Sequence, residues 1–291
     1  MTLPENASQD PVHRLVAEQY AAALERAQKR QGAGCCGGSS ACGASAALAG
    51  YEAPSEGAEQ AAAASFGCGN PLSFAEVLPG QTVIDLGSGA GYDLLLAAQK
   101  VGPEGRVIGI DMTDAMLEAA RNHAKAAGAH QVQLRKGLIE AMPVAAEQAD
   151  WVISNCVINL SPDKPKVFAE IARVLKTGGQ FRISDIVAED LPAWLKASPI
   201  AYAACVAGAL PESLYLQGLR DAGLVDVAVV SRLVYDPEQI RALVETDFAD
   251  AGLEPTLWNS LIGQVSGKVA SVTVTGRKPE AAGCGCAPGC C

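Results

Sequence analysis

The chain has 291 residues, of which 49% are hydrophobic and 5% aromatic, which is typical of a globular protein with a full hydrophobic core. Its formal net charge of -10 disfavours binding to nucleic acid or to an anionic membrane surface. Residues 1–10 lack a secretory signal pattern, and the apolar stretch 199–210 is shorter than the roughly 20 residues that span a bilayer. We expect a cytosolic protein and, since nothing demands an oligomer, a monomer.

The first predicted element is an amphipathic helix over residues 12–30, followed by a Gly-, Ser- and Cys-rich loop over 32–43. From residue 81 onward, strand and helix patterns alternate. This alternation is typical of a mostly parallel sheet covered by helices on both faces, and we predict an α/β, doubly wound, seven-stranded sheet. The predicted strands cover residues 82–86, 107–111, 132–136, 151–155, 180–184, 225–234 and 269–276.

Helices are expected between these strands, with capping residues at several of their ends. Thr113 and Ser161 are predicted N-caps, and Gly128 and Gly178 are predicted helix stops. The predicted helices cover residues 92–101, 114–127, 162–175, 191–210, 211–222 and 237–267.

A glycine-rich loop follows the first predicted strand. Gly87, Gly89 and Gly91 alternate there, whereas a dinucleotide-binding loop has its third glycine at the position that Tyr92 occupies. The spacing resembles the loop of class I methyltransferases, which bind S-adenosylmethionine, and tight packing of the turn is the alternative. Under this resemblance Asp85 meets the ammonium group of the cofactor.

Two further acidic residues complete the expected cofactor site. Asp111 ends the second strand, 20 residues after Gly91, and is placed to bind both ribose hydroxyls. Glu140 follows the third strand and is placed to reach the adenine edge. We also assign to the cofactor site Gly87, Ser88, Gly89, Met112, Ile139 and Asn155.

Ten cysteines in a cytosolic chain are better interpreted as ligands than as a disulfide framework, because the compartment keeps thiols reduced. Cys156 directly follows the fourth strand. The first and fourth strands flank the ligand crevice of a doubly wound sheet, so we expect Cys156 to face the methyl donor. A small buried hydrophobic role is the alternative for such a cysteine.

Three cysteine contexts resemble the arsenite S-adenosylmethyltransferase family: SNCVINLSPDK at 154–164, FGCGNP at 66–71 and ACVAGAL at 204–210. The resemblance runs from about residue 66 to 210 and implies that Cys68, Cys156 and Cys205 bind As(III) as thiolates, a soft centre on soft ligands. The arsenic lone pair then accepts the methyl group, so no general base is required. The three histidines are accordingly expected on the solvated surface: His13, His123 and His130.

The resemblance also implies redox turnover. An N-terminal cysteine forms a disulfide with the counterpart of Cys68, and thioredoxin or glutathione reduces it. Cys35, Cys36 and Cys42 all lie in the N-terminal loop, and Cys35 or Cys36 is the preferred partner. The cysteines of the tail are expected to scavenge arsenic or another metal, with a passive solvated tail as the alternative: Cys284, Cys286, Cys290 and Cys291.

The resulting plan has an N-terminal helix and Cys-rich loop at 1–70, a Rossmann-like cofactor domain at 71–187, a substrate-side region at 188–278 and a flexible Cys-rich tail at 279–291. Two other functions stay open. A methyltransferase for an organic small molecule would leave the cysteines unexplained. A non-catalytic metalloid-binding protein would use the cysteines but would not need an adenosine pocket.

Overall fold

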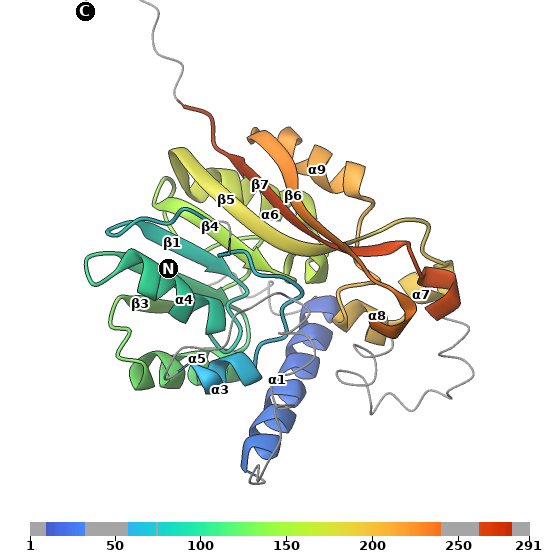
Figure 1. The fold of residues 1–291 in the computed structure, drawn as a ribbon, viewed down its shortest axis with the longest axis horizontal. Coiled ribbons are helices and arrows are strands. Elements are labelled where there is room, and N and C mark those ends of the chain that lie inside the picture. The colour runs from blue at the N-terminus through green and yellow to red at the C-terminus, as the bar shows by residue number, and fades with distance from the viewer. Residues whose placement is uncertain (1–9, 33–57, 74, 240–261, 281–291) are drawn as a thin grey trace, which may run out of the picture.

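The computed structural model describes residues 10–32, 58–73, 75–239 and 262–280. Seven strands form one sheet in the order β3-β2-β1-β4-β5-β7-β6 (Figure 1). All pairings from β3 to β5 are parallel, and β7 runs antiparallel to both β5 and β6. The strands are β1 (Thr82–Leu86), β2 (Arg106–Asp111), β3 (Val132–Lys136), β4 (Ala149–Asn155), β5 (Leu175–Ala188), β6 (Val225–Val234) and β7 (Val269–Arg277). The prediction of a doubly wound, mostly parallel, seven-stranded sheet is confirmed.

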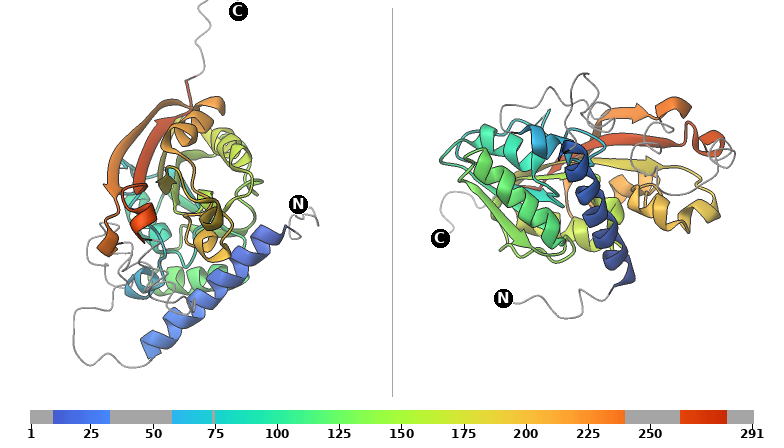
Figure 2. Two further views of the ribbon diagram at one scale, coloured as in Figure 1. Left: turned by 90° about the vertical axis from the view of Figure 1, so that its right-hand side faces the viewer. Right: turned by 90° about the horizontal axis from the view of Figure 1, so that it is seen from below.

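Helices cover both faces of this sheet (Figure 2). The helices are α1 (Pro11–Gly32), α3 (Glu59–Ala63), α4 (Tyr92–Val101), α5 (Asp114–Ala126), α6 (Lys164–Val174), α7 (Ala193–Lys196), α8 (Pro199–Ala203) and α9 (Glu212–Asp221), with a 3-10 turn, η2, at Ile158–Leu160. Along β1, Val83 packs with α4, and the next residue, Ile84, packs with the α6 and α9 side. Alternate side chains of one strand therefore enter two separate cores, which is why the central strands are apolar throughout.

The ends of two helices show how local sequence sets the boundaries. Gly128 has φ +64°, Ala129 N–H donates to Ala124 O (2.9 Å) and Gly128 N–H donates to Lys125 O (3.2 Å), which is a Schellman ending of α5 as predicted. The predicted Ser161 cap of α6 is wrong. Asp163 caps this helix, because its side chain accepts a hydrogen bond from Lys166 N–H.

Two further expectations need correction. Gly178 does not stop α6, which ends at Val174; it lies within β5. The helix predicted over 191–210 is two short helices, α7 and α8, because Pro199 cannot continue the preceding turn. Most of the helix predicted over 237–267 lies outside the described residues; its described ends, 237–239 and 262–265, are helical.

Strands from two predicted segments share the one sheet. β6 and β7 come from the region 188–278, and β7 pairs with β5 over nine residue pairs from Gln180 to Ala188.

Within the described part of the chain, no helix combines the length and the apolar character needed to cross a membrane.

Candidate functional site

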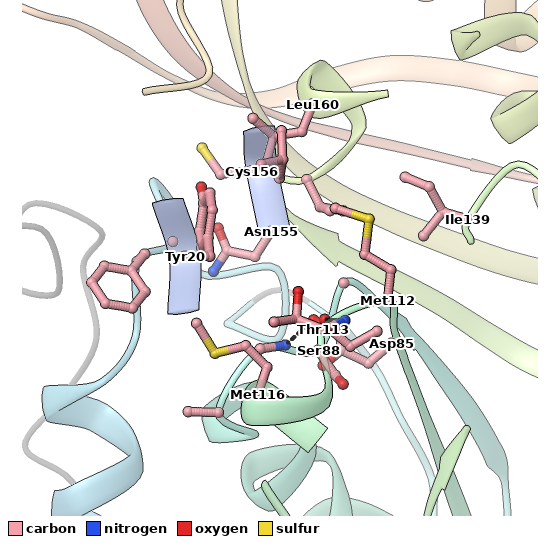
Figure 3. Close-up of a pocket in the computed structure, with 18 of the residues that line it drawn as sticks. Tyr20, Asp85, Ser88, Met112, Thr113, Met116, Ile139, Asn155, Cys156 and Leu160 are labelled. Atoms are coloured by element: carbon pink, nitrogen blue, oxygen red, sulfur yellow. Dashed lines mark hydrogen bonds between the residues drawn. The ribbon is translucent and has the colours of Figure 1, made fainter. Parts of the chain in front are cut away.

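A pocket lies at the carboxyl ends of β1, β2 and β4 (Figure 3). This is the crevice where doubly wound sheets bind ligands, because the loops after these strands diverge there. The structure brings together all nine residues predicted for the cofactor on the pocket wall: Asp85, Gly87, Ser88, Gly89, Asp111, Met112, Ile139, Glu140 and Asn155.

The glycine loop between β1 and α4 forms the floor of the pocket. Gly87 has φ +61°, and a Cβ at this position would stand 2.3 Å from the Val157 side chain, so no larger residue fits. Gly89 N–H donates to Asp111 Oδ2 (2.9 Å), and Thr113 N–H donates to Asp111 Oδ1 (2.8 Å). The loop is thus tied to the end of β2, and Asp111 is fixed facing the pocket.

Buried carboxyl groups give this pocket an affinity for positive charge. Burial is the main cause that raises the pKa of Asp85 well above its ordinary value, and the neighbouring Asp93 and Asp111 raise it further. Burial also raises the pKa of Asp111, against the backbone hydrogen bonds from Thr113 and Gly89. A cationic ligand would relieve the repulsion between these groups.

Two buried polar atoms on the pocket wall, one in β1 and one in the glycine loop, are unsatisfied among the described residues. Asp85 Oδ2 and Ser88 Oγ are buried, and neither has a hydrogen-bond partner among the described residues. Buried polar atoms are normally satisfied, so a ligand with an ammonium group and hydrogen-bonding atoms fits this floor. The residues therefore fit the amino-acid end of S-adenosylmethionine.

Glu140 is held from two sides. His13 Nε2 lies 3.0 Å from Glu140 Oε1, and Ser161 Oγ donates to the same oxygen at 2.5 Å. Burial opposes the charge on Glu140, but the hydrogen bonds from His13 and Ser161 outweigh it and lower the pKa. Glu140 is therefore a fixed acceptor on the pocket wall.

The expectation of solvated histidines is wrong for two of the three. His13 is half-buried and bonded to Glu140, because α1 lies across the pocket. His123 is half-buried, and its Nδ1 lies 2.8 Å from Ala90 O in the glycine loop. His130 is exposed, as expected.

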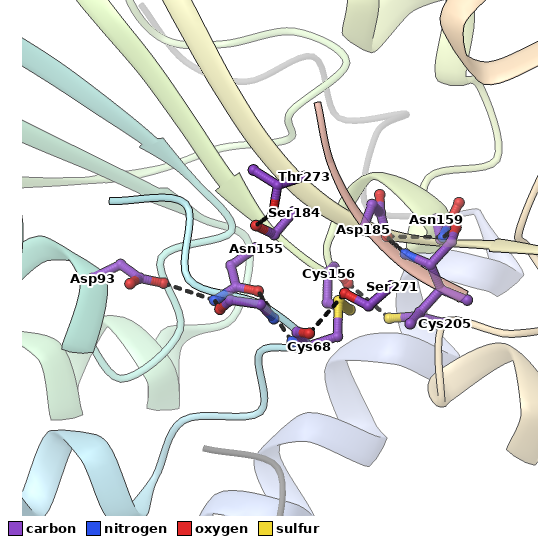
Figure 4. Close-up of a disulfide and its surroundings, with 12 residues drawn as sticks. Cys68, Asp93, Asn155, Cys156, Asn159, Ser184, Asp185, Cys205, Ser271 and Thr273 are labelled. Atoms are coloured by element: carbon purple, nitrogen blue, oxygen red, sulfur yellow. Dashed lines mark hydrogen bonds between the residues drawn. A yellow bond between two sulfur atoms is a disulfide. The ribbon is translucent and has the colours of Figure 1, made fainter. Parts of the chain in front are cut away.

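The sulfur atoms of two predicted arsenic ligands meet beside the pocket (Figure 4). Cys156 lines the pocket, has φ +59° and forms a disulfide with Cys68 across a Cα–Cα distance of 5.7 Å. The resemblance implied an N-terminal partner for Cys68, but the structure pairs it with Cys156. The preferred N-terminal partners and the tail cysteines lie outside the described residues: Cys35, Cys36, Cys42, Cys284, Cys286, Cys290 and Cys291.

Cys205 completes the cysteine group. It is buried, has φ +61°, and its thiol donates to Cys156 O at 2.7 Å. Burial raises the pKa of this thiol, and the nearby Asp185 raises it further, whereas the Tyr20 hydroxyl, 3.9 Å from the sulfur, lowers it. Left-handed backbone at a non-glycine residue is costly, and it occurs at both Cys156 and Cys205, which suggests that the positions of the sulfur atoms matter.

Asp185 is a site residue that the sequence analysis missed. Its carboxylate and the sulfur atoms of Cys68 and Cys156 all lie within 4.8 Å of one another. Asn159 Nδ2 donates to Asp185 Oδ1 (2.8 Å), and the Tyr215 hydroxyl donates to Oδ2 (3.1 Å). One signal in the sequence could have identified it. Asp185 directly follows the predicted strand 180–184, much as Asp111 ends the predicted strand 107–111.

Asn155 contacts the Cys68 segment as well as lining the cofactor pocket. Its Oδ1 accepts from the N–H groups of Cys68 (3.1 Å) and Gly69 (3.2 Å). Its Nδ2 donates to Gly69 O (2.7 Å) and to Asp93 Oδ2 (3.0 Å). One amide therefore ties the Cys68 segment to α4, a role that its assignment to the cofactor site did not include.

The chain is similar to known methyltransferases in sequence and in structure. The family model described as a methyltransferase domain matches residues 78–239. An arsenite methyltransferase of Halobacterium salinarum is 43% identical over 201 residues, which cover 68% of this chain and 51% of the relative. The crystal structure of CrArsM, an arsenic (III) S-adenosylmethionine methyltransferase from Chlamydomonas reinhardtii, is 33% identical with a TM-score of 0.59, covering 75% of this chain and 68% of that one. The chain belongs to the arsenite methyltransferase family.

The chain matches only part of the length of its curated relatives. The chain spans 51% of the Halobacterium arsenite methyltransferase and 64% of that of Aquipseudomonas alcaligenes, which is 35% identical over 227 residues. Within this chain, the methyltransferase model at 78–239 includes Cys156 and Cys205, whereas Cys68 and α1 precede it.

Proposed function

We propose that the protein transfers the methyl group of S-adenosylmethionine to trivalent arsenic bound by the thiolates of Cys68, Cys156 and Cys205. The observation that carries this proposal is the cluster of these three cysteines at the edge of the cofactor pocket. Cys156 lines the pocket, Cys68 is bonded to it, and Cys205 donates a hydrogen bond to its carbonyl oxygen.

The cofactor, when bound, supplies an activated methyl group on a positively charged sulfur. In this proposal Asp85 holds its ammonium group, Asp111 its ribose hydroxyls and Glu140 the adenine edge. Asp85 Oδ2 is buried without a hydrogen-bond partner among the described residues, which supports its role toward the ammonium group. His13 fixes the Glu140 carboxylate, which supports its role toward the adenine edge. The acidic floor also favours the cofactor's positive charge.

The arsenic site requires reduction first. In the disulfide, Cys68 and Cys156 have no thiol to offer a metalloid. A dithiol or two monothiols of the thioredoxin or glutathione class supply two electrons and two protons and are themselves oxidised to a disulfide. This requirement fits a reducing compartment such as the cytosol, and the proposed site uses one chain, so a monomer suffices.

Arsenite loading is balanced by water. Three thiols replace the three hydroxyl groups of arsenous acid, and their protons leave with those hydroxyls as three water molecules. Arsenic keeps its lone pair, which would form the new bond to the methyl carbon while the bond from that carbon to the sulfonium sulfur breaks and its electron pair stays with sulfur. The residues therefore have to align donor and acceptor rather than remove a proton. The His13 imidazole on the pocket wall is engaged by Glu140, which is compatible with a reaction that needs no general base.

The test is methyl transfer from labelled S-adenosylmethionine to arsenite, comparing the intact protein with Cys156→Ser, each with and without a dithiol reductant. We expect methylated arsenic from the intact, reduced protein alone. Cofactor binding by both proteins shows that the variant is folded. If Cys156→Ser keeps activity on an organic acceptor, the result would support an organic-substrate methyltransferase. If the protein binds arsenic but not the cofactor, the result would support a metalloid-binding protein.

A further inference from the structure

Helix α1 contributes side chains to the pocket wall although it precedes the matched methyltransferase region. It packs against α5, α8 and η2. His13, Val16 and Tyr20 line the pocket, and their spacing of three and four residues places them on one face of the helix. His13 and Tyr20 are two turns apart, about 10 Å along the axis. One helix face therefore reaches two different regions of the pocket.

At one end, α1 contacts Glu140. The side chains of His13 and Glu140 are 13% and 9% exposed, so their 3.0 Å contact is largely shielded from water. The Ser161 hydroxyl donates to the same carboxylate oxygen. Two donors on one oxygen fix the orientation of the carboxylate before any ligand arrives, which reduces the entropy lost on binding.

Two turns further along, near its middle, α1 contacts the cysteine cluster. The Tyr20 hydroxyl lies 3.9 Å from Cys205 Sγ and donates to Ala203 O at 3.3 Å. Its ring meets Phe66 edge to face, with centroids 5.8 Å apart. Figure 3 shows Tyr20 on the same side of the pocket as Cys156.

The hydrogen bonds around Tyr20 change when a metalloid replaces the thiol proton. The Cys205 thiol donates a hydrogen bond to Cys156 O. Once that proton has left with water, the sulfur is an acceptor only, and the Tyr20 hydroxyl can turn from Ala203 O toward it. A hydrogen bond to a thiolate sulfur would hold the sulfur in one orientation.

We propose that α1 is a wall of the active site in which His13 positions Glu140 for the nucleoside and Tyr20 positions the Cys205 sulfur for arsenic. Both are positioning residues, because each acts through another side chain. The Tyr20 half rests on the proposed arsenic function, whereas the His13 half requires only that the pocket binds S-adenosylmethionine.

The experiment uses the full chain under reducing conditions, with His13→Ala, His13→Gln, Tyr20→Phe and, as control, Glu18→Gln at an exposed position of α1. The Kd for labelled S-adenosylmethionine and the Kd for arsenite are measured separately, followed by kcat of methyl transfer. His13→Ala should raise the cofactor Kd roughly tenfold with arsenite affinity unchanged, and His13→Gln, which keeps a donor, should restore much of it.

Tyr20→Phe keeps the ring and removes only the hydroxyl. It should leave the cofactor Kd unchanged and lower arsenite affinity and kcat by about three- to tenfold, the effect of one ordinary hydrogen bond. Glu18→Gln should behave as the intact protein. Equal losses at both ligands in both variants, or no loss in either, would overturn the proposal in favour of a structural α1. If the intact protein binds the cofactor but never methylates arsenite, the proposed function fails, and the His13 variants alone decide the nucleoside half.

Discussion

Asp185 is a buried carboxyl group whose surroundings set the pH at which it ionises. Burial is the main cause that raises its pKa from 3.8 to about 7, against hydrogen bonds from Ile186 and Tyr215 and the charge of Lys164. The folded protein therefore holds this proton more tightly than the unfolded chain does. Stability is greatest below the unfolded value and falls as pH rises toward about 7, after which the full cost persists.

Asp185→Asn should remove this cost. The difference between 3.8 and about 7 corresponds to at most about 4 kcal/mol, so the variant should unfold at higher denaturant concentration at neutral and alkaline pH. Denaturant unfolding across the acidic to neutral range measures the effect. Asp114→Asn, at an 80% exposed side chain, is the control. Parallel curves for the intact protein and Asp185→Asn would show that Asp185 ionises normally.

Asp85 makes cofactor affinity depend on pH in the opposite sense. Burial and then Asp93 and Asp111 raise its pKa, and only its ionised form can pair with an ammonium group. S-adenosylmethionine should therefore bind more weakly as pH falls through this raised pKa, and binding in that range should release a proton.

Calorimetry in two buffers with different ionisation enthalpies measures that proton. Asp85→Asn should weaken cofactor binding about tenfold or more and lose most of the proton release, because the charged partner is gone. Asp114→Asn should leave both unchanged. Undiminished proton release by Asp85→Asn would assign it to another group, with Asp111 the next candidate because its pKa is also raised.

At the scale of elements, the short segment around Cys68 depends on close contact with the sheet. Ser271 Oγ donates to Cys68 O at 2.8 Å, and a Cβ on Gly69 would stand 2.5 Å from Ser184 Cβ. Neither contact partner belongs to the cofactor pocket. The segment can therefore lie flat on β5 and β7 only because residue 69 has no side chain.

Gly69→Ala should push this segment off the sheet and move the Cys68 sulfur. We expect arsenite affinity and methyl transfer to fall at least tenfold, since a shift of about 1 Å misaligns reacting groups, and cofactor affinity to fall by a smaller factor, through Asn155, which bonds Gly69. Gly263→Ala is the matched control, because a Cβ there meets nothing within 4 Å. Equal loss of both ligands in Gly69→Ala would indicate general misfolding.

The elements that sequence predicts best are those whose boundaries are set locally. β1 and β3 have the predicted ends, because a glycine directly follows each strand, Gly87 after β1 and Gly137 after β3. The region 191–210 was misread as one helix, since alanine and leucine there have high helix propensity while Pro199 and packing against η2 divide it.

The residues of the candidate site also fall into two groups, those set by a local sequence pattern and those set by tertiary contacts. Asp85 and Asp111 adjoin a glycine loop of known spacing, so sequence placed them on the pocket wall. His13 and Tyr20 reach the pocket only because α1 packs against distant helices, and no local pattern records that contact. Tertiary contacts over such separations are what a single sequence leaves open.

At the scale of the whole molecule, the Cys68–Cys156 disulfide joins the segment before the sheet to the end of β4. It spans 88 residues, so it removes much of the freedom of the unfolded chain, and loop-closure entropy gives an upper estimate of about 4–5 kcal/mol. The same two sulfur atoms are proposed arsenic ligands. Reduction should thus loosen the fold at the moment it opens the site, and arsenic should tie the same two regions together again.

Melting temperatures of three states test this exchange of cross-links. The oxidised protein should melt on the order of 10 °C above the reduced one, and arsenite added to the reduced protein should recover a large part of that difference. Cys156→Ser should melt at one temperature with or without reductant and respond little to arsenite, because it can form neither link. A melting temperature of the intact protein that ignores reductant would mean that Cys68 and Cys156 do not cross-link the chain in solution, whereas a reductant effect without recovery by arsenite would separate the disulfide from arsenic binding.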